Sequence, residues 1–118
     1  MDYVLLIAVD PSVYAVLPPE QAQGIYAEYD AYTAELRARG VYVDGNPLQS
    51  VDTATTVQVR DGVRSTTDGP YAEAKEVLLG YYVIRVDSLD EALEWAAKIP
   101  DARYGSIEVR PVMELPGS

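Results

Sequence analysis

Residues 67–82 read Thr-Asp-Gly-Pro-Tyr-Ala-Glu-Ala-Lys-Glu-Val-Leu-Leu-Gly-Tyr-Tyr, so a turn sequence runs directly into an apolar strand. The turn is predicted at residues 68–70, because Asp accepts hydrogen bonds from the backbone that follows and Pro fixes its own φ. Pro70 also suits the first position of a helical turn, which we expect over residues 70–76. The strand, residues 77–87, is apolar on both alternating faces. A strand with this pattern is covered on both sides in the folded protein.

A second strand of the same kind opens the chain, and a helix follows it. Residues 3–9 (YVLLIAV) are apolar on both faces, and a loop with three prolines, residues 10–19, comes next. In residues 20–39 apolar side chains recur at steps of three and four, which predicts a helix. Gly40 suits the position just after its last turn.

The second helix is indicated by its first residues. Ser88 and Glu91 form a capping box, and the helix is expected to continue to about Ile99, because Pro100 stops it. The side chains expected to be buried follow the helical repeat: Leu89, Ala92, Leu93, Ala96 and Ile99.

A β-hairpin is predicted between the two helices. Residues 55–60 (TTVQVR) alternate and are rich in β-branched side chains, and Asp61-Gly62 is a preferred two-residue type I′ turn. Residues 63–67 should therefore return antiparallel. The resulting register places three polar side chains on the same face as Val57 and Val59: Arg64, Thr66 and Asp68. This face either lines a pocket or, with the hairpin at the sheet edge, is exposed to solvent.

The order of these elements predicts an α+β fold. An irregular strand over residues 41–48 follows the first helix, and residues 106–113 form the last strand, where Pro111 indicates an edge position or a bulge. Two helices separated by antiparallel strands are typical of a ferredoxin-like antiparallel sheet with two helices on one face. We expect a single domain over residues 1–113 and a C-terminal tail over residues 114–118.

The two strands that are apolar on both faces predict that a second copy of the chain packs against the sheet. Two helices can cover only one face of the sheet, whereas residues 3–9 and 77–86 are apolar on both faces. No further element remains in the sequence to cover the other face. A second copy of the same sheet would cover it, so we expect a homodimer.

Composition excludes several classes of function. The 118 residues include no histidine and no cysteine, which rules out a Ser-His-Asp triad, a thiolate nucleophile and zinc sites built from these ligands. The net charge of −10, with nine scattered basic residues, argues against nucleic acid and anionic membranes as partners. We expect no metal and no cofactor, and cytoplasmic localisation, since neither a signal peptide nor a membrane-spanning run is evident.

Candidate site residues cluster around the turn at residues 68–70. Asp68 is either a cap for the backbone that follows or an acceptor or base at the mouth of a pocket. The charged side chains after the turn either form a solvated surface or anchor a polar ligand, and tyrosines add aromatic walls that carry hydroxyl groups. The predicted ligand-binding set is Arg64, Thr66, Asp68, Tyr71, Glu73, Lys75 and Tyr82.

With these motifs in place, the chain resembles the YCII-related family and, within it, the DGPF-domain branch. That branch carries an Asp-Gly-Pro-Phe-Ala-Glu-Thr-Lys-Glu signature, and residues 68–76 here read Asp-Gly-Pro-Tyr-Ala-Glu-Ala-Lys-Glu. Tyr71 thus adds a hydroxyl where the signature has Phe. The resemblance covers nearly the whole chain and includes the start at residues 1–7 and four later segments: residues 54–62, 80–82, 90–96 and 105–112.

The resemblance implies a dimeric α+β barrel, in which two sheets pack face to face and each protomer holds a pocket. Members are often bacterial proteins, some encoded near or fused to extracytoplasmic-function sigma factors, which implies a functional link to a sigma factor. A His-Asp pair has been proposed for enzymes of the broader family. That proposal does not carry over to this chain, because it contains no histidine.

Three interpretations of function follow. The first is a homodimer that binds or senses a small molecule near residues 68–71. The second is a cofactor-free enzyme of the isomerase, lyase or oxygenase type, with Asp68 or Glu73 as base and Tyr71, Arg64 or Lys75 stabilising charge. This second interpretation requires a buried carboxylate with a raised pKa. The third is a partner in a sigma-factor-linked regulatory system.

Overall fold

A four-stranded antiparallel sheet forms the centre of the protein in the computed structural model, which describes residues 1–71 and 74–117. Its strand order is β2-β5-β1-β6, so the first and third strands of the ferredoxin-like unit lie in the middle. Strand β6 lies at an edge, as Pro111 predicted. The strand bounds are β1 (Asp2–Val9), β2 (Tyr42–Pro47), β5 (Val77–Arg85) and β6 (Ser106–Pro111).

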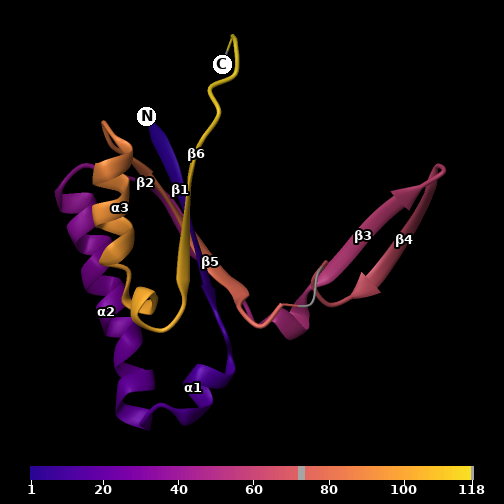
Figure 1. Ribbon diagram of the computed structural model, residues 1–118, viewed down its shortest axis with the longest axis horizontal. Coiled ribbons are helices and arrows are strands. Elements are labelled where there is room, and N and C mark those ends of the chain that lie inside the picture. Colours follow the sequence, from indigo (N-terminus) through magenta and orange to yellow (C-terminus); the bar gives the residue numbers. More distant parts are fainter. Residues whose placement is uncertain (72–73, 118) are drawn as a thin grey trace.

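Two longer helices lie on the same side of this sheet (Figure 1). They are α2 (Pro19–Ala38) and α3 (Leu89–Ala97), and the Ser88 hydroxyl caps α3 by accepting a hydrogen bond from the Glu91 N–H at 3.2 Å. The α+β class and the single helical layer are therefore confirmed. A short helix, α1 (Ser12–Val16), lies within the expected proline loop, and two 3₁₀ turns complete the fold: η1 (Val51–Thr53) and η2 (Pro100–Arg103).

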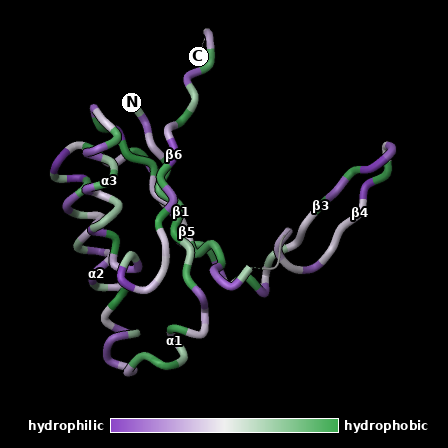
Figure 2. The backbone as a smooth tube through the Cα atoms, viewed as in Figure 1, coloured by the Kyte–Doolittle hydropathy of each residue, from purple (hydrophilic) through white to green (hydrophobic). Residues whose placement is uncertain are grey.

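The core lies between the sheet and the two helices. Alternate residues of β1 are buried against the helices, beginning at Tyr3, and Leu36 and Ile99 are almost fully buried opposite them. Figure 2 shows the apolar residues concentrated in the central strands. The expected stripe of α3 is wrong at two positions, since Leu89 and Leu93 remain 48% and 46% exposed. Half-buried Trp95 packs against the core instead.

Buried tyrosines make the stability of this core sensitive to alkaline pH. Burial raises the pKa of Tyr32, whose hydroxyl donates to the Trp95 carbonyl at 2.8 Å, and it also raises the pKa of Tyr29 and Tyr82. A folded pKa above the unfolded value favours the protonated form, so this stability is complete below about pH 10 and is lost as the pH rises further. We expect the free energy of unfolding, measured in urea, to fall above about pH 10. Tyr32→Phe should make that fall shallower, and equal pH profiles would contradict the assignment.

The hairpin forms a separate two-stranded sheet. Strands β3 (Thr55–Arg60) and β4 (Val63–Asp68) pair in the predicted register, with Val59 opposite Arg64 and Val57 opposite Thr66. Asp61 and Gly62 have φ values of 52° and 77°, as a type I′ turn requires. The hairpin is not an edge of the main sheet, however. It extends away from it on the side opposite to the helices (Figure 1).

The face of the main sheet that points away from the helices lacks a covering layer within the described chain. Apolar side chains of its two central strands lie opposite one another on this face, with Val4 paired to Val83 and Leu6 paired to Tyr81. These side chains are only partly buried. Polar residues of the outer strands flank them, including Glu108 opposite Leu6. We call this surface the open face.

Candidate functional site

A cavity of about 440 Å³ lies at the base of the hairpin, where the hairpin joins the main sheet. Ala54 and Pro70, which flank β3 and β4, form part of its wall. The rest comes from the connection between β2 and β3, from the segment just before β5 and from the start of β5. The full lining is Leu48, Gln49, Ser50, Val51, Thr53, Ala54, Pro70, Ala74, Glu76, Val77 and Leu78. We call this cavity the hairpin pocket.

Most walls of the hairpin pocket are apolar, and a few polar groups interrupt them. Glu76 is the one charged side chain among the described residues of the lining, and its carboxylate accepts a hydrogen bond from the Ser106 hydroxyl at 2.9 Å. Elsewhere in the lining, the Thr53 hydroxyl donates to the Ser50 carbonyl at 2.7 Å, which closes the η1 turn. An apolar cavity of this size with few, fixed polar groups is typical of small-molecule sites.

The turn at residues 68–70 fixes the pocket wall through its backbone. The Gly69 N–H donates to the Ala54 carbonyl at 2.8 Å, and the Thr56 hydroxyl donates to the Gly69 carbonyl at 2.7 Å. Gly69 has a φ of 101°, a conformation that other residues rarely adopt. The helical turn expected over residues 70–76 is not present in its described part, where residues 70–71 and 74–76 form bends and irregular backbone.

None of the predicted ligand-binding residues that the structure describes lines this pocket. Arg64, Thr66 and Asp68 lie on the exposed strand β4. Tyr71 is 78% exposed, and Lys75 is also exposed.

Two further predicted residues lie elsewhere. Glu73 falls outside the described residues. Tyr82 lies in the core on the helix-facing side, where its hydroxyl is 2.7 Å from the Thr33 hydroxyl and its ring meets Tyr32 edge-on. The structure therefore brings the turn itself to a pocket but leaves the predicted side chains around it dispersed.

A buried aspartate that is hydrogen-bonded to two tyrosines was not predicted from the sequence. Asp101 is 2% exposed, and its carboxylate accepts hydrogen bonds from the hydroxyls of Tyr14 on α1 and Tyr29 on α2. Burial raises the pKa of Asp101, and the nearby positive charge of Arg103 acts in the opposite direction. The partners are 87 and 72 residues away along the chain, so no local motif connects them. These two hydrogen bonds connect α1 and α2 to η2.

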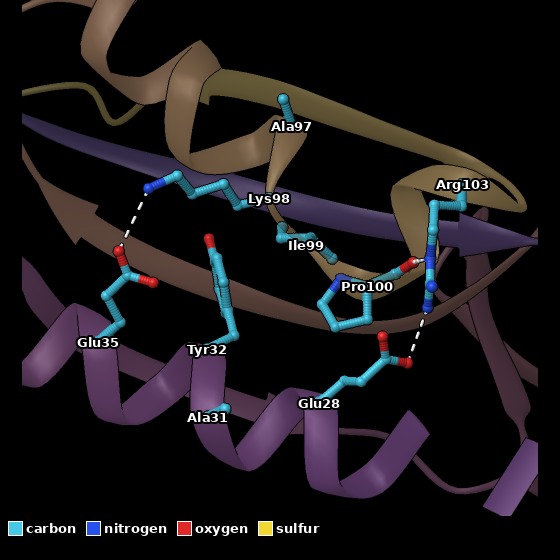
Figure 3. Close-up of a pocket in the computed structure, with 9 residues that line it drawn as sticks. All are labelled: Glu28, Ala31, Tyr32, Glu35, Ala97, Lys98, Ile99, Pro100 and Arg103. Carbon is cyan, nitrogen blue, oxygen red and sulfur yellow. Dashed lines mark hydrogen bonds and ion pairs between the residues drawn. The ribbon is translucent and has the colours of Figure 1, made fainter. Parts of the chain in front are cut away.

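A second cavity, also of about 440 Å³, lies between α2 and the end of α3 (Figure 3). Ion pairs stand at its two ends, Arg103 with Glu28 at 2.8 Å and Lys98 with Glu35 at 3.2 Å. All four charged side chains are about half exposed to solvent, so each pair contributes little to stability. The charged groups of this cavity are already paired with one another, so it is a weaker candidate for a ligand site than the hairpin pocket.

Two negative findings apply to residues 1–71 and 74–117. No helix there combines the length and the apolar character needed to cross a membrane. No group of three or more acidic side chains in that part of the chain is placed to hold a metal ion.

The fold and the pocket together define a small α+β protein of ferredoxin-like topology. Residues 1–116 match the family model described as the YCII-related domain, and the chain belongs to that family. A Rhizobium meliloti (strain 1021) protein described as uncharacterized is 34% identical over 114 residues, which cover 95% of this chain and 92% of the relative.

A solved structure has a similar fold. It is 5-chloro-2-hydroxyhydroquinone dehydrochlorinase (TftG) from Burkholderia phenoliruptrix AC1100, in complex with 2,5-dihydroxybenzoquinone. The match has a TM-score of 0.55 and 16% sequence identity, and it covers 96% of this chain and 94% of the enzyme. At this identity the likeness concerns the fold.

Proposed function

We propose that this protein is a homodimer of the DGPF-domain branch that binds a small organic molecule in the hairpin pocket. The observation that carries the proposal is a mostly apolar cavity of about 440 Å³ with a single carboxylate among the described residues of its lining. The volume falls within the range of small-molecule sites. The Asp-Gly-Pro turn, which carries the branch signature, forms part of the wall through Pro70.

The chemistry of the lining selects a class of ligand. Apolar walls such as Val51 and Leu78 favour a flat or compact hydrocarbon framework, while the Glu76 carboxylate accepts hydrogen bonds from a donor. A carboxylate in the pocket and a net charge of −10 both disfavour an anionic ligand. A neutral ring that carries hydroxyl groups meets these requirements. The fold neighbour was solved with a hydroxylated ring compound, 2,5-dihydroxybenzoquinone, although that quinone ionises readily. Neutral hydroxylated aromatic compounds are therefore the first probes to test.

The open face supports the homodimer. Val4, Leu6 and Val83 line a surface to which no described helix or loop contributes a cover. Burying such apolar side chains against a second sheet is favourable by about 25 cal/mol per Å². The two-fold arrangement that results would be self-complementary.

Enzymatic turnover is the second candidate, and the fold neighbour favours it because that protein is a dehydrochlorinase. The proposed bases give it less support. Of the two proposed bases, Asp68 is exposed and Glu73 lies outside the described residues. The buried carboxylate that the structure does describe, Asp101, does not line the hairpin pocket. Binding without turnover is therefore the better-supported function.

The test is a thermal-shift and calorimetric screen of hydroxylated aromatic compounds against the wild type and Glu76→Gln. We expect a compound that raises the melting temperature of the wild type and binds Glu76→Gln at least about tenfold more weakly, because a hydrogen bond to a charged group is worth about 1.5–3 kcal/mol. Glu94→Gln is the matched control, since it removes the same charge from an exposed position on α3, away from both the hairpin pocket and the open face.

The outcomes separate the alternatives. Equal affinity for the wild type and Glu76→Gln would contradict the assigned pocket. Loss of binding in Asp68→Asn would instead move the site to the exposed side of the turn. Consumption of a bound compound, followed by chromatography, would establish turnover.

A further inference from the structure

The hairpin, residues 55–68, has little support from its own chain. Its two strands pair only with each other, and every residue of β4 is exposed. An isolated two-stranded hairpin is marginally stable in water. The radius of gyration of the chain, 16.4 Å, exceeds the value of about 13.5 Å expected for a compact domain of this length. The hairpin therefore has the form of an arm, and we use that word for residues 55–68.

The arm has two different faces. On one face Val57 and Val59 are 56% and 58% exposed, and the register places Arg64 opposite Val59. The other face carries polar side chains such as Gln58 and one exposed valine, Val63, beside the turn. Neighbouring β-branched side chains beside an arginine are typical of contact surfaces rather than of solvated hairpins.

The arm differs in net charge from the rest of the chain. Two arginines and two aspartates cancel within residues 55–68, so the remainder of the chain carries the entire net charge of −10. Of the ion pairs among the described residues, none involves Arg60 or Arg64. A second copy of this chain presents an acidic body, and Arg64 is the side chain of this face that can pair with one of its carboxylates.

We propose that the arm packs against the body of the partner subunit through the face that carries Val57, Val59 and Arg64. This inference rests on the proposed homodimer. The arm leaves the protein on the side of the open face (Figure 1), so a partner sheet seated on that face lies next to it. Exposed apolar side chains on both surfaces would be buried together.

Docking of the arm also affects the ligand site. Ala54 and Pro70 are the residues at the base of the arm, and both line the hairpin pocket. When the arm is fixed on the partner, this wall is fixed as well, which lowers the entropy lost on binding. Dimer formation and ligand binding should therefore strengthen each other.

The experiment uses the absence of cysteine from the 118-residue chain. Val57→Cys and Gln58→Cys each provide one attachment point, on opposite faces of the same strand, for a cysteine-directed photo-crosslinker. We expect irradiation to give covalent dimers from Val57→Cys with a yield several-fold above that from Gln58→Cys. Peptide mapping should place the attachment outside residues 55–68 of the other copy.

Light scattering on the unlabelled protein shows whether a negative result concerns the arm contact alone or the homodimer as well. A dimer with equal or absent cross-linking from the two variants would overturn the arm and leave the homodimer standing. A monomer would overturn both.

Charge reversal tests the same face independently. Arg64→Glu is expected to weaken dimerisation about tenfold or more, whereas Arg60→Glu, with the same net charge on the opposite face, should change it little. Equal effects of the two reversals would show that overall charge, not this face, is responsible.

Discussion

Gly105→Ala is expected to lower the free energy of unfolding by about 3 kcal/mol or more, which is a large fraction of the stability of a domain of this size. A Cβ atom at this position would lie 2.1 Å from the Ala8 carbonyl oxygen and 2.8 Å from Cγ2 of Val9. The Ala8 oxygen belongs to the backbone of β1, so it cannot move aside as a flexible side chain could. Either β1 or the segment that enters β6 must shift, and both belong to the central sheet.

Gly24→Ala is the matched control for this prediction. Gly24 lies inside α2, and a Cβ atom added there would meet nothing within 4 Å. The same substitution should therefore raise the stability by about 0.5–1 kcal/mol, because alanine is the better helix former. Chemical denaturation of both variants measures the two effects. A Gly105→Ala protein within about 0.5 kcal/mol of the wild type would show that β1 and β6 do not approach as closely as described.

Asp101→Ala is expected to cost about 3 kcal/mol of stability. The substitution removes the acceptor of the Tyr14 and Tyr29 hydroxyls, and an unsatisfied buried donor costs about 1–3 kcal/mol. It also leaves a small cavity where α1, α2 and η2 meet. Denaturation in urea, monitored by circular dichroism, provides the measurement.

Two further variants show which property of Asp101 accounts for the expected loss of stability. Asp101→Asn keeps the shape and one acceptor oxygen, so its loss should be clearly smaller than that of Asp101→Ala. Asp87→Ala removes an exposed aspartate and should stay within about 0.5 kcal/mol of the wild type. If Asp101→Asn and Asp101→Ala were equally unstable, the negative charge rather than the hydrogen bonds would be the important property of this site.

Most of the fold could be predicted from local periodicity in the sequence. The helical repeat over residues 20–39 and the strands that are apolar on both faces predicted the main layers. The turn sequence Asp61-Gly62 was enough to predict the register of the hairpin. The separation of the hairpin from the sheet was not predicted. Strand partners are chosen by tertiary packing, and nothing within β3 and β4 specifies whether a third strand pairs with them.

The site was harder to predict than the fold for a physical reason. The hairpin pocket is assembled from segments that are separated along the chain, and its one charged residue, Glu76, was considered only as part of a charged turn. Asp101 follows a proline at the end of a helix and carries no local signal of its tyrosine partners. Motifs located the turn at residues 68–70 because its chemistry is local. The side chains that surround a cavity are set by the fold as a whole.

The position of Trp95 gives this protein a built-in optical reporter. It is the one tryptophan among ten tyrosines, and its ring lies 6.2 Å from that of Tyr32, which in turn lies 5.3 Å from Tyr82. Light absorbed by these tyrosines is passed efficiently to the indole while α2, α3 and the sheet remain packed together. Loss of that transfer, seen as recovered tyrosine emission, would follow core opening without any added dye.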